Sequence, residues 1–388
     1  MLTKLQNNTY FWACRDKNLK LDNMEDFKSK RTDKGIMELS LPFALGVALG
    51  CALMPSGRQD AFPTLCLICS TALGALILWC MRKKRPLGAY ALCFLLAGLL
   101  SGLSVGISTI PSALEPRLPA QARLSFISGI EEIDWSSEEL PALAKALLCA
   151  DKSGLSKDLK ETFRDAGASH LLALSGLHLG LIYSILQFLL SPLGGFRVSR
   201  LLRGILTVGL SSFYTLMCGA SDSLVRALLF IILSEISKFF PSRMARRRDI
   251  LCAALLIQLC IRPGSIRSLS FQLSYLAVAS IVFVLPTLQE IYPRGKRHEL
   301  GKKVWDAACT AICCQAATAP LLWVKFRTFP KYFILTNLLA VGVCELFLMC
   351  SLALTALSGL GWKAHILKSL TEALGEGLIF ILETICSL

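Results

Sequence analysis

Long apolar blocks alternate with short polar segments along the 388 residues of the chain. Most blocks are about as long as the roughly 20 helical residues that cross a bilayer. Uninterrupted apolar stretches of this length are typical of helices surrounded by lipid. We therefore predict an all-α, polytopic transmembrane helix bundle with about nine to eleven spans. The blocks cover residues 37–54, 62–81, 87–107, 168–191, 200–220, 223–240, 249–262, 268–290, 305–325, 331–358 and 365–387.

Two of the blocks leave the number of spans open. The block at 249–262 is short for a straight crossing, so it predicts either a tilted span or a re-entrant helix buried within the protein. The block at 365–387 contains Glu372 and Glu376, which are costly in a lipid core. It predicts a helix that either spans the membrane or lies at its interface.

The polar segments divide the chain into five regions. Residues 140–150 and 156–165 have the pattern of two short amphipathic helices, and Ser156 is a favourable N-cap for the second. The predicted regions are a polar, basic N-terminal tail (1–36), a three-span membrane region (37–110), an extracytoplasmic polar segment (111–166), a transmembrane domain (167–360) and a C-terminal membrane or interfacial helix (361–388).

The positive charges favour one orientation of this bundle. The formal net charge is +14, and cytoplasmic loops of membrane proteins are enriched in Lys and Arg. If the N-terminus is cytoplasmic and 249–262 crosses the membrane, alternating spans place every strong basic cluster on the inner side, which explains most of the net charge without bound nucleic acid. These clusters lie at 28–34, 82–85, 197–203, 243–248 and 294–303.

The sequence lacks the signatures of several classes of site. Most of the 16 cysteines lie within apolar blocks, where we expect small packing residues rather than disulfides. Cys309 and Cys313 share a helix face, but no histidine or acidic residue nearby completes a tetrahedral zinc site. There is no GxxxxGK[ST], HExxH or GxSxG motif. We therefore expect no enzymatic activity, no bound metal and no cofactor.

One apolar block contains two histidines and two serines within the run AGASHLLALSGLHLGL. On a helix with His170 as the origin, His178 falls at about 80° and Ser175 at about 140°. Gly176 and Gly180 fall at about 240° and 280°, where a neighbouring helix can approach closely. The pattern predicts one polar face that lines a cavity and one glycine face that packs.

Other interpretations of these polar residues stay open. His170 and His178 also fit hydrogen bonds between neighbouring helices. Ser175 and His178 have the spacing of a nucleophile and its base, but no acidic residue is placed to orient the histidine. A zinc site on the two histidines lacks the i, i+4 spacing that one helix face requires.

Further polar residues lie in apolar helices. Asp222 and Arg226 are spaced for an ion pair, and Arg226 also suits contact with phosphates. Glu345 lies midway along its block and should face the interior, because a carboxylate facing lipid is costly. The predicted transport-path residues are His170, Ser175, His178, Asp222, Arg226, Gln272, Ser274, Asn337 and Glu345, with Gly176 and Gly180 as helix-packing residues.

The run AGASHLLALSGLHLGL resembles the signature of the competence domain in ComEC-type proteins. Four other segments, ALLCADKSGLSKDLKETFRDAG, CGASDSLVRALLF, IRPGSIRSLSFQLSYLAV and QAATAPLLWVKF followed by LTNLLAV, are similar to segments of that family. Together they lie in the family's order within roughly residues 143–345.

The resemblance implies a channel component of the bacterial cytoplasmic membrane that passively conducts single-stranded DNA during natural transformation. The implied partners are single-stranded DNA, the lipid bilayer, and separate DNA-binding, nuclease and motor proteins. The stretch after Ser112 is too short for the family's OB-type barrel, and the sequence ends at Leu388 without a β-lactamase-like domain. We therefore expect a short form. The polar residues alone equally fit a small-solute or ion-coupled transporter that uses Glu345 and the histidines.

Overall fold

The computed structural model is helical, with no strand in the residues that it describes. This confirms the all-α class. The second predicted block (62–81) and the N-terminal tail up to residue 34 lie outside the described residues. The described residues are 35–53, 87–103, 117–169, 171–172, 175–193, 197–239, 247–291, 299–326, 333–362 and 364–387.

Most of the helices outside the polar segment lie within predicted apolar blocks, whereas α7 within that segment was not predicted. The polar segment contains three helices, α7 (Arg117–Glu131), α8 (Glu139–Cys149) and α9 (Lys157–Asp165). The other helices are α4 (Gly35–Leu53), α6 (Leu87–Leu103), α10 (Gly176–Leu189), η3 (Ser191–Leu193), α11 (Arg197–Met217), α12 (Asp222–Ser237), α13 (Arg247–Ile261), η4 (Pro263–Arg267), α14 (Leu269–Phe283), α15 (Leu285–Gln289), α16 (Glu299–Phe326), α17 (Phe333–Gly359) and α18 (His365–Cys386).

Both amphipathic helices predicted in the polar segment are present. Ser156 caps α9, since its side chain accepts a hydrogen bond from the backbone N–H of Leu159 (3.1 Å). Glu139 lies in the first turn of α8, where a negative charge is favourable. That helix ends where Ala150 adopts a left-handed conformation (φ 59°).

The described residues form two compact units. The smaller unit contains residues 35–103 and 229–275, and the larger one contains residues 117–228 and 276–387. In the smaller unit α4 and α6 pack at very close range, because Gly46 lies against the backbone of Leu95 and Gly98 against that of Phe43. Close approach through glycine is a common way to join helices within a membrane.

The larger unit has its core where α8 meets α17 and α18. Most of the 11 residues of α8 are buried, among them Leu140, Leu143 and Leu147. Gly375 of α18 is the point of closest approach, because a β-carbon there would lie 2.5 Å from Leu140 Cδ2 and 2.8 Å from Phe347 Cε2. The polar segment therefore supplies the centre of this core.

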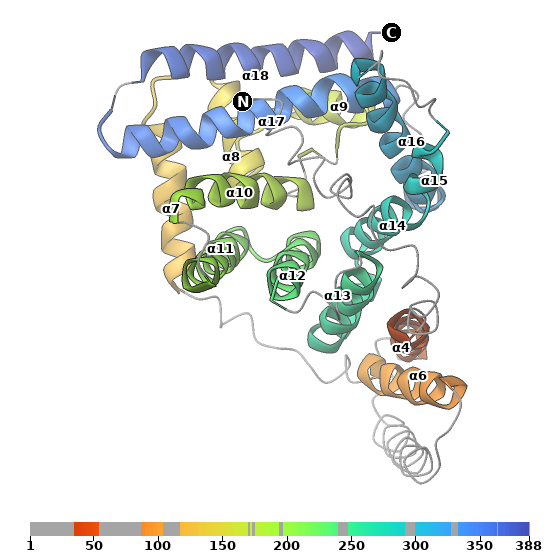
Figure 1. The fold of residues 1–388 in the computed structure, drawn as a ribbon. Helices are drawn as coiled ribbons and strands as arrows, with labels where there is room; N and C mark the ends of the chain where they lie inside the picture. The colour runs from red at the N-terminus through yellow and green to blue at the C-terminus, as the bar shows by residue number, and fades with distance from the viewer. Residues whose placement is uncertain are drawn as a thin grey trace. The chain divides into compact units, whose positions relative to one another are not determined.

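The helices α17 and α18 form an antiparallel pair (Figure 1). The polar segment contacts this pair near both of the pair's ends. At the open end of the pair, Thr336 Oγ1 donates to Ala166 O (2.7 Å) and Cys386 Sγ to Thr162 O (3.4 Å). Near the connection between the two helices, Thr355 of α17 lies beside Gly129 of α7.

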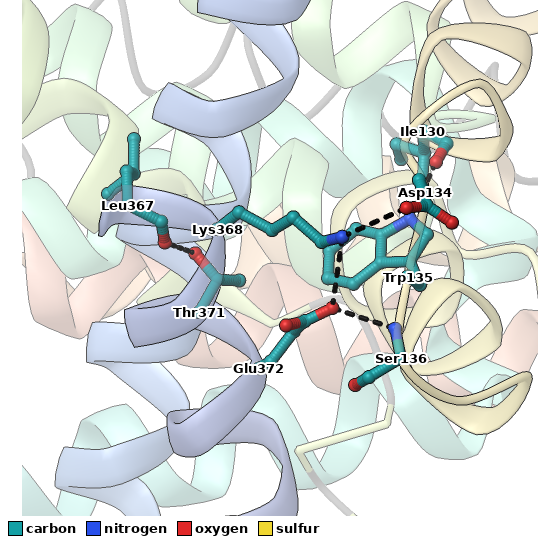
Figure 2. A network of polar contacts seen from close by, with 8 residues as sticks. All are labelled: Ile130, Asp134, Trp135, Ser136, Leu367, Lys368, Thr371 and Glu372. Atoms are coloured by element: carbon teal, nitrogen blue, oxygen red, sulfur yellow. Dashed lines mark hydrogen bonds and ion pairs between the residues drawn. The ribbon is translucent and has the colours of Figure 1, made fainter. Parts of the chain in front are cut away.

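A polar network joins the start of α18 to the turn between α7 and α8 (Figure 2). Lys368 Nζ lies 3.4 Å from Asp134 Oδ2 and 3.9 Å from Glu372 Oε1. The same Glu372 oxygen accepts a hydrogen bond from the backbone N–H of Ser136 (2.7 Å), and Trp135 Nε1 donates to Ile130 O (2.8 Å). Glu372, one of the two acidic residues that made this block ambiguous in the sequence, thus has a structural role.

Two helical stretches in the described residues are long and apolar enough to cross a membrane by length and composition alone, Val304–Lys325 and Leu335–Gly359. Shorter apolar helical stretches occupy Ser40–Leu49, Gly176–Leu189 and Leu269–Phe283. The larger number of spans expected from the sequence stays a prediction.

Candidate functional site

The helix that carries the run AGASHLLALSGLHLGL begins later than predicted. The apolar block starts at residue 168, but α10 begins at Gly176, and the residues just after α9 are in turns. His170 lies outside the described residues. A single helix from His170 to His178 was therefore a wrong expectation, because the chain first leaves α9 through a turn and then starts a new helix.

Ser175 is the N-cap of α10 instead of a residue on its face. Its backbone is extended, and its Oγ accepts a hydrogen bond from the N–H of Leu177 (3.2 Å). His178 Nδ1 lies 3.2 Å from the backbone nitrogen of Ser175 and 3.0 Å from its Oγ. Ser175 and His178 thus form a capping box in which the imidazole takes the place usually filled by Glu or Gln.

Arg226 of α12 lies directly against the first residue of α10. A β-carbon at Gly176 would lie 2.8 Å from Arg226 Nη2 and 3.4 Å from the β-carbon of Ala227. Arg226 is only 8% exposed, and His178 only 2%. The structure therefore brings Ser175, His178 and Arg226 together at the N-terminus of α10, with Gly176 allowing the close approach.

The remaining predicted residues lie elsewhere in the fold. Asp222 begins α12, one turn before the buried arginine. Asn337 and Glu345 lie on α17, and both are half-buried. Gly180 is buried on α10, where its carbonyl accepts a hydrogen bond from Ser184 Oγ (2.9 Å).

Gln272 and Ser274 lie on α14 in the smaller unit. Gln272 Nε2 donates to Ile266 O in η4 (2.7 Å), so this amide closes the turn that precedes its own helix. One turn further along α14, Tyr275 donates to Gln258 Oε1 of α13 (2.9 Å). The side-chain amide of Gln272 therefore makes a local structural contact, and its place on a transport path stays a prediction.

Two titratable groups lie at the end of α8, the buried thiol of Cys149 and the carboxylate of Asp151 just after it. Burial raises the pKa of the Cys149 thiol to about 12. Hydrogen bonds from Ser153, first from its side chain and then from its backbone N–H, lower the pKa of Asp151 below its usual value. Among the described residues, no three His, Cys, Asp or Glu side chains lie together as a metal site.

A line of hydroxyls on α11 was not identified from the sequence. Thr207, Ser211 and Thr215 are almost completely buried, and Gln187 of α10 donates to Thr207 Oγ1 (3.2 Å). The opposite face of α11 exposes large apolar residues such as Ile205. The spacing of four residues between the hydroxyls is the signal that would have found this line.

Comparison with known families places this site in context. Residues 147–388 match the family described as Competence protein. This match covers more than half of the chain and includes α10, α11 and Arg226. The chain belongs to the competence protein family.

A curated relative of this competence family member is ComE operon protein 3 of Bacillus subtilis (strain 168). The two are 24% identical over 239 residues, which make up 61% of this chain and 29% of the relative. The chain therefore spans less than a third of the relative's length. No solved structure matches the chain.

Proposed function

We propose that this member of the competence protein family is an inner-membrane channel component for the uptake of single-stranded DNA in natural transformation. The observation that carries the proposal is the buried guanidinium of Arg226 at the N-terminus of α10. A buried arginine in an apolar helical unit is costly and is typically kept for function.

The charge at this position suits a phosphate. The first N–H groups of a helix lack intrahelical partners, and they give its N-terminus a partial positive charge. Arg226 adds a full positive charge beside Gly176, where no side chain stands between the guanidinium and the helix. Phosphates bind well to such positions, and they supply most of the affinity for nucleic acids.

Several features support a polytopic membrane protein. The helices α16 and α17 contain stretches that can cross a bilayer. The buried hydroxyls and exposed apolar residues of α11 reverse the pattern of a helix that faces water. The basic clusters favour a cytoplasmic N-terminus. Within such a bundle, polar side chains are expected to face the interior or a water-filled path.

In the proposed mechanism the strand moves passively along a polar path, and separate proteins capture, trim and pull the DNA. We propose no catalytic role for Ser175, because its hydroxyl and His178 Nδ1 already contribute to capping α10. No metal or cofactor enters the proposal.

Substitution of the buried arginine tests this function in the native host. Arg226→Ala should lower transformation at least about tenfold, the effect of losing roughly 1.4 kcal/mol of phosphate interaction. DNA bound at the cell surface should stay at the wild-type level. Arg164→Ala is the matched control, because Arg164 is exposed on α9 and pairs with Asp165 on the same helix. Unchanged transformation in Arg226→Ala, with the protein present at normal levels, would refute the channel.

A small-solute or ion-coupled transporter is the second candidate. The observation that favours it is Glu345, a carboxyl group midway along the more apolar of the two described stretches that are long enough to cross a membrane. In that case Glu345→Gln should abolish pH-dependent flux in proteoliposomes while transformation stays normal. Loss of transformation without a change in flux would favour the channel.

A further inference from the structure

The run AGASHLLALSGLHLGL begins with a helix-terminating turn. Gly167 follows α9 with a left-handed backbone (φ 76°), and its N–H donates to Arg164 O (3.0 Å). The N–H of Ala168 donates to Phe163 O (2.7 Å). These two bonds and the left-handed glycine form a Schellman motif, so the first residues of the run form a turn that ends one helix and directs the chain toward the next.

The carbonyl of Ala166 points out of this turn and needs a partner. Ala166 is 2% exposed and Ala168 is completely buried, which keeps water away from the carbonyl. A buried carbonyl is almost always paired. Here the partner is Thr336 of α17, whose completely buried Oγ1 donates to it over 2.7 Å.

The hydroxyl of Thr336 contacts the turn that precedes the start of α10. The turn is followed by the buried residues Leu171 and Leu172, and then by Ser175 and the capping box of α10. The contact crosses 170 positions of sequence, so it is set by the docking of α17. A shift of the turn would move the N-terminus of α10, against which Arg226 packs.

We propose that Thr336 is a positioning residue for the transport site: its hydroxyl fixes the turn at 166–168 and thereby the start of α10. This proposal rests on the proposed function, since it assigns Thr336 a role in the same site. It also predicts a local structural effect that can be measured without DNA uptake.

The structural test uses Thr336→Val, which removes the hydroxyl at nearly constant shape, and Thr336→Ser, which keeps it. Ala168→Cys is introduced into each as a buried reporter, and maleimide labelling is followed by peptide mass spectrometry. Loss of one buried hydrogen bond should raise the labelling rate at position 168 about fivefold in Thr336→Val and leave it unchanged in Thr336→Ser. Cys149, in the same core, should stay protected in both.

Transformation supplies the second measurement. Thr336→Val should transform poorly, and Thr336→Ser should transform normally. Thr384→Val is the matched control, because the side chain of that exposed threonine donates to Phe380 O of its own helix. Wild-type labelling at position 168 in Thr336→Val, or equal exposure of Cys149, would overturn the positioning role. If labelling changes as expected but neither Thr336→Val nor Arg226→Ala lowers transformation, the proposed function fails and the structural role of Thr336 stands.

Discussion

Replacing Gly375 with alanine tests the packing of the core in the larger unit. A β-carbon at this position would lie 2.5 Å from Leu140 Cδ2 and 2.8 Å from Phe347 Cε2. Both neighbours are completely buried, so neither can move aside without shifting α8 or α17. Gly377, half a turn further along α18, has nothing within 4 Å of its β-carbon position. Gly377→Ala is therefore a matched control on the same helix.

The two variants share one energetic contribution and differ in another. Alanine is favoured over glycine in a helix by about 0.5–1 kcal/mol at both positions. Overpacking of a dense core costs about 1–3 kcal/mol and applies only to Gly375→Ala. The free energies of unfolding should therefore differ by about 1–3 kcal/mol. At roughly 2–4 °C per kcal/mol for a cooperative unit of 150–250 residues, Gly375→Ala should have a Tm at least about 2 °C below that of Gly377→Ala.

A thermal ramp in detergent micelles with a fluorogenic maleimide measures this difference. Cys149 and Cys344 are completely buried in the affected core, so their reaction reports its opening. Cys386 is exposed, and Cys386→Ser should be present in every sample to lower the background. Equal midpoints for the two glycine variants would refute the close packing of α8 against α17 and α18.

Two further predictions concern the end of α8. Burial raises the pKa of Cys149 to about 12, so a maleimide at pH 8 should modify Cys386 and leave Cys149 intact in the folded protein. Mass spectrometry of peptides measures the labelling of each cysteine, and equal labelling of the two would contradict the prediction. Hydrogen bonds to the charged Asp151 carboxylate lower its pKa. These bonds stabilise the fold at a pH above the usual pKa of 3.8, and the stabilisation is lost as the pH falls through the lowered pKa. Ser153→Ala should therefore lower the Tm at pH 6 but not at a pH below both the usual and the lowered pKa of Asp151. An equal loss of Tm at the two pH values would exclude the hydrogen bond to the charged carboxylate.

Local signals in the sequence predicted local structure well. The apolar blocks located the helices, and the serine before α9 predicted its N-cap, because helix formation and capping depend on neighbouring residues. The start of α10 was missed for a related reason. An apolar block does not mark its internal turns, and here Gly167 ends one helix while Ser175 begins the next. The histidine at the third position of α10 also does not fit the usual capping-box pattern.

The candidate site was predictable only in part. The sequence predicted that Ser175 and His178 share one polar face, and it singled out Arg226 separately as a polar residue in an apolar helix. Their grouping at one helix end depends on the packing of α12 against Gly176, which no local pattern encodes. The contact of Thr336 with Ala166 spans still more of the chain. Such long-range contacts follow from how whole helices dock.

The burial of α8 by α17 and α18 also sets an order of events during synthesis. The apolar residues of α8, such as Leu143, leave the ribosome before the helices that cover them. At about 5–20 residues per second, the intervening chain takes roughly 10 to 45 s to make. During that interval the nascent protein exposes a surface prone to aggregation, and its core can close only when the last helix arrives. Efficient biogenesis should therefore depend on a chaperone or on the insertion machinery protecting α8 in the meantime.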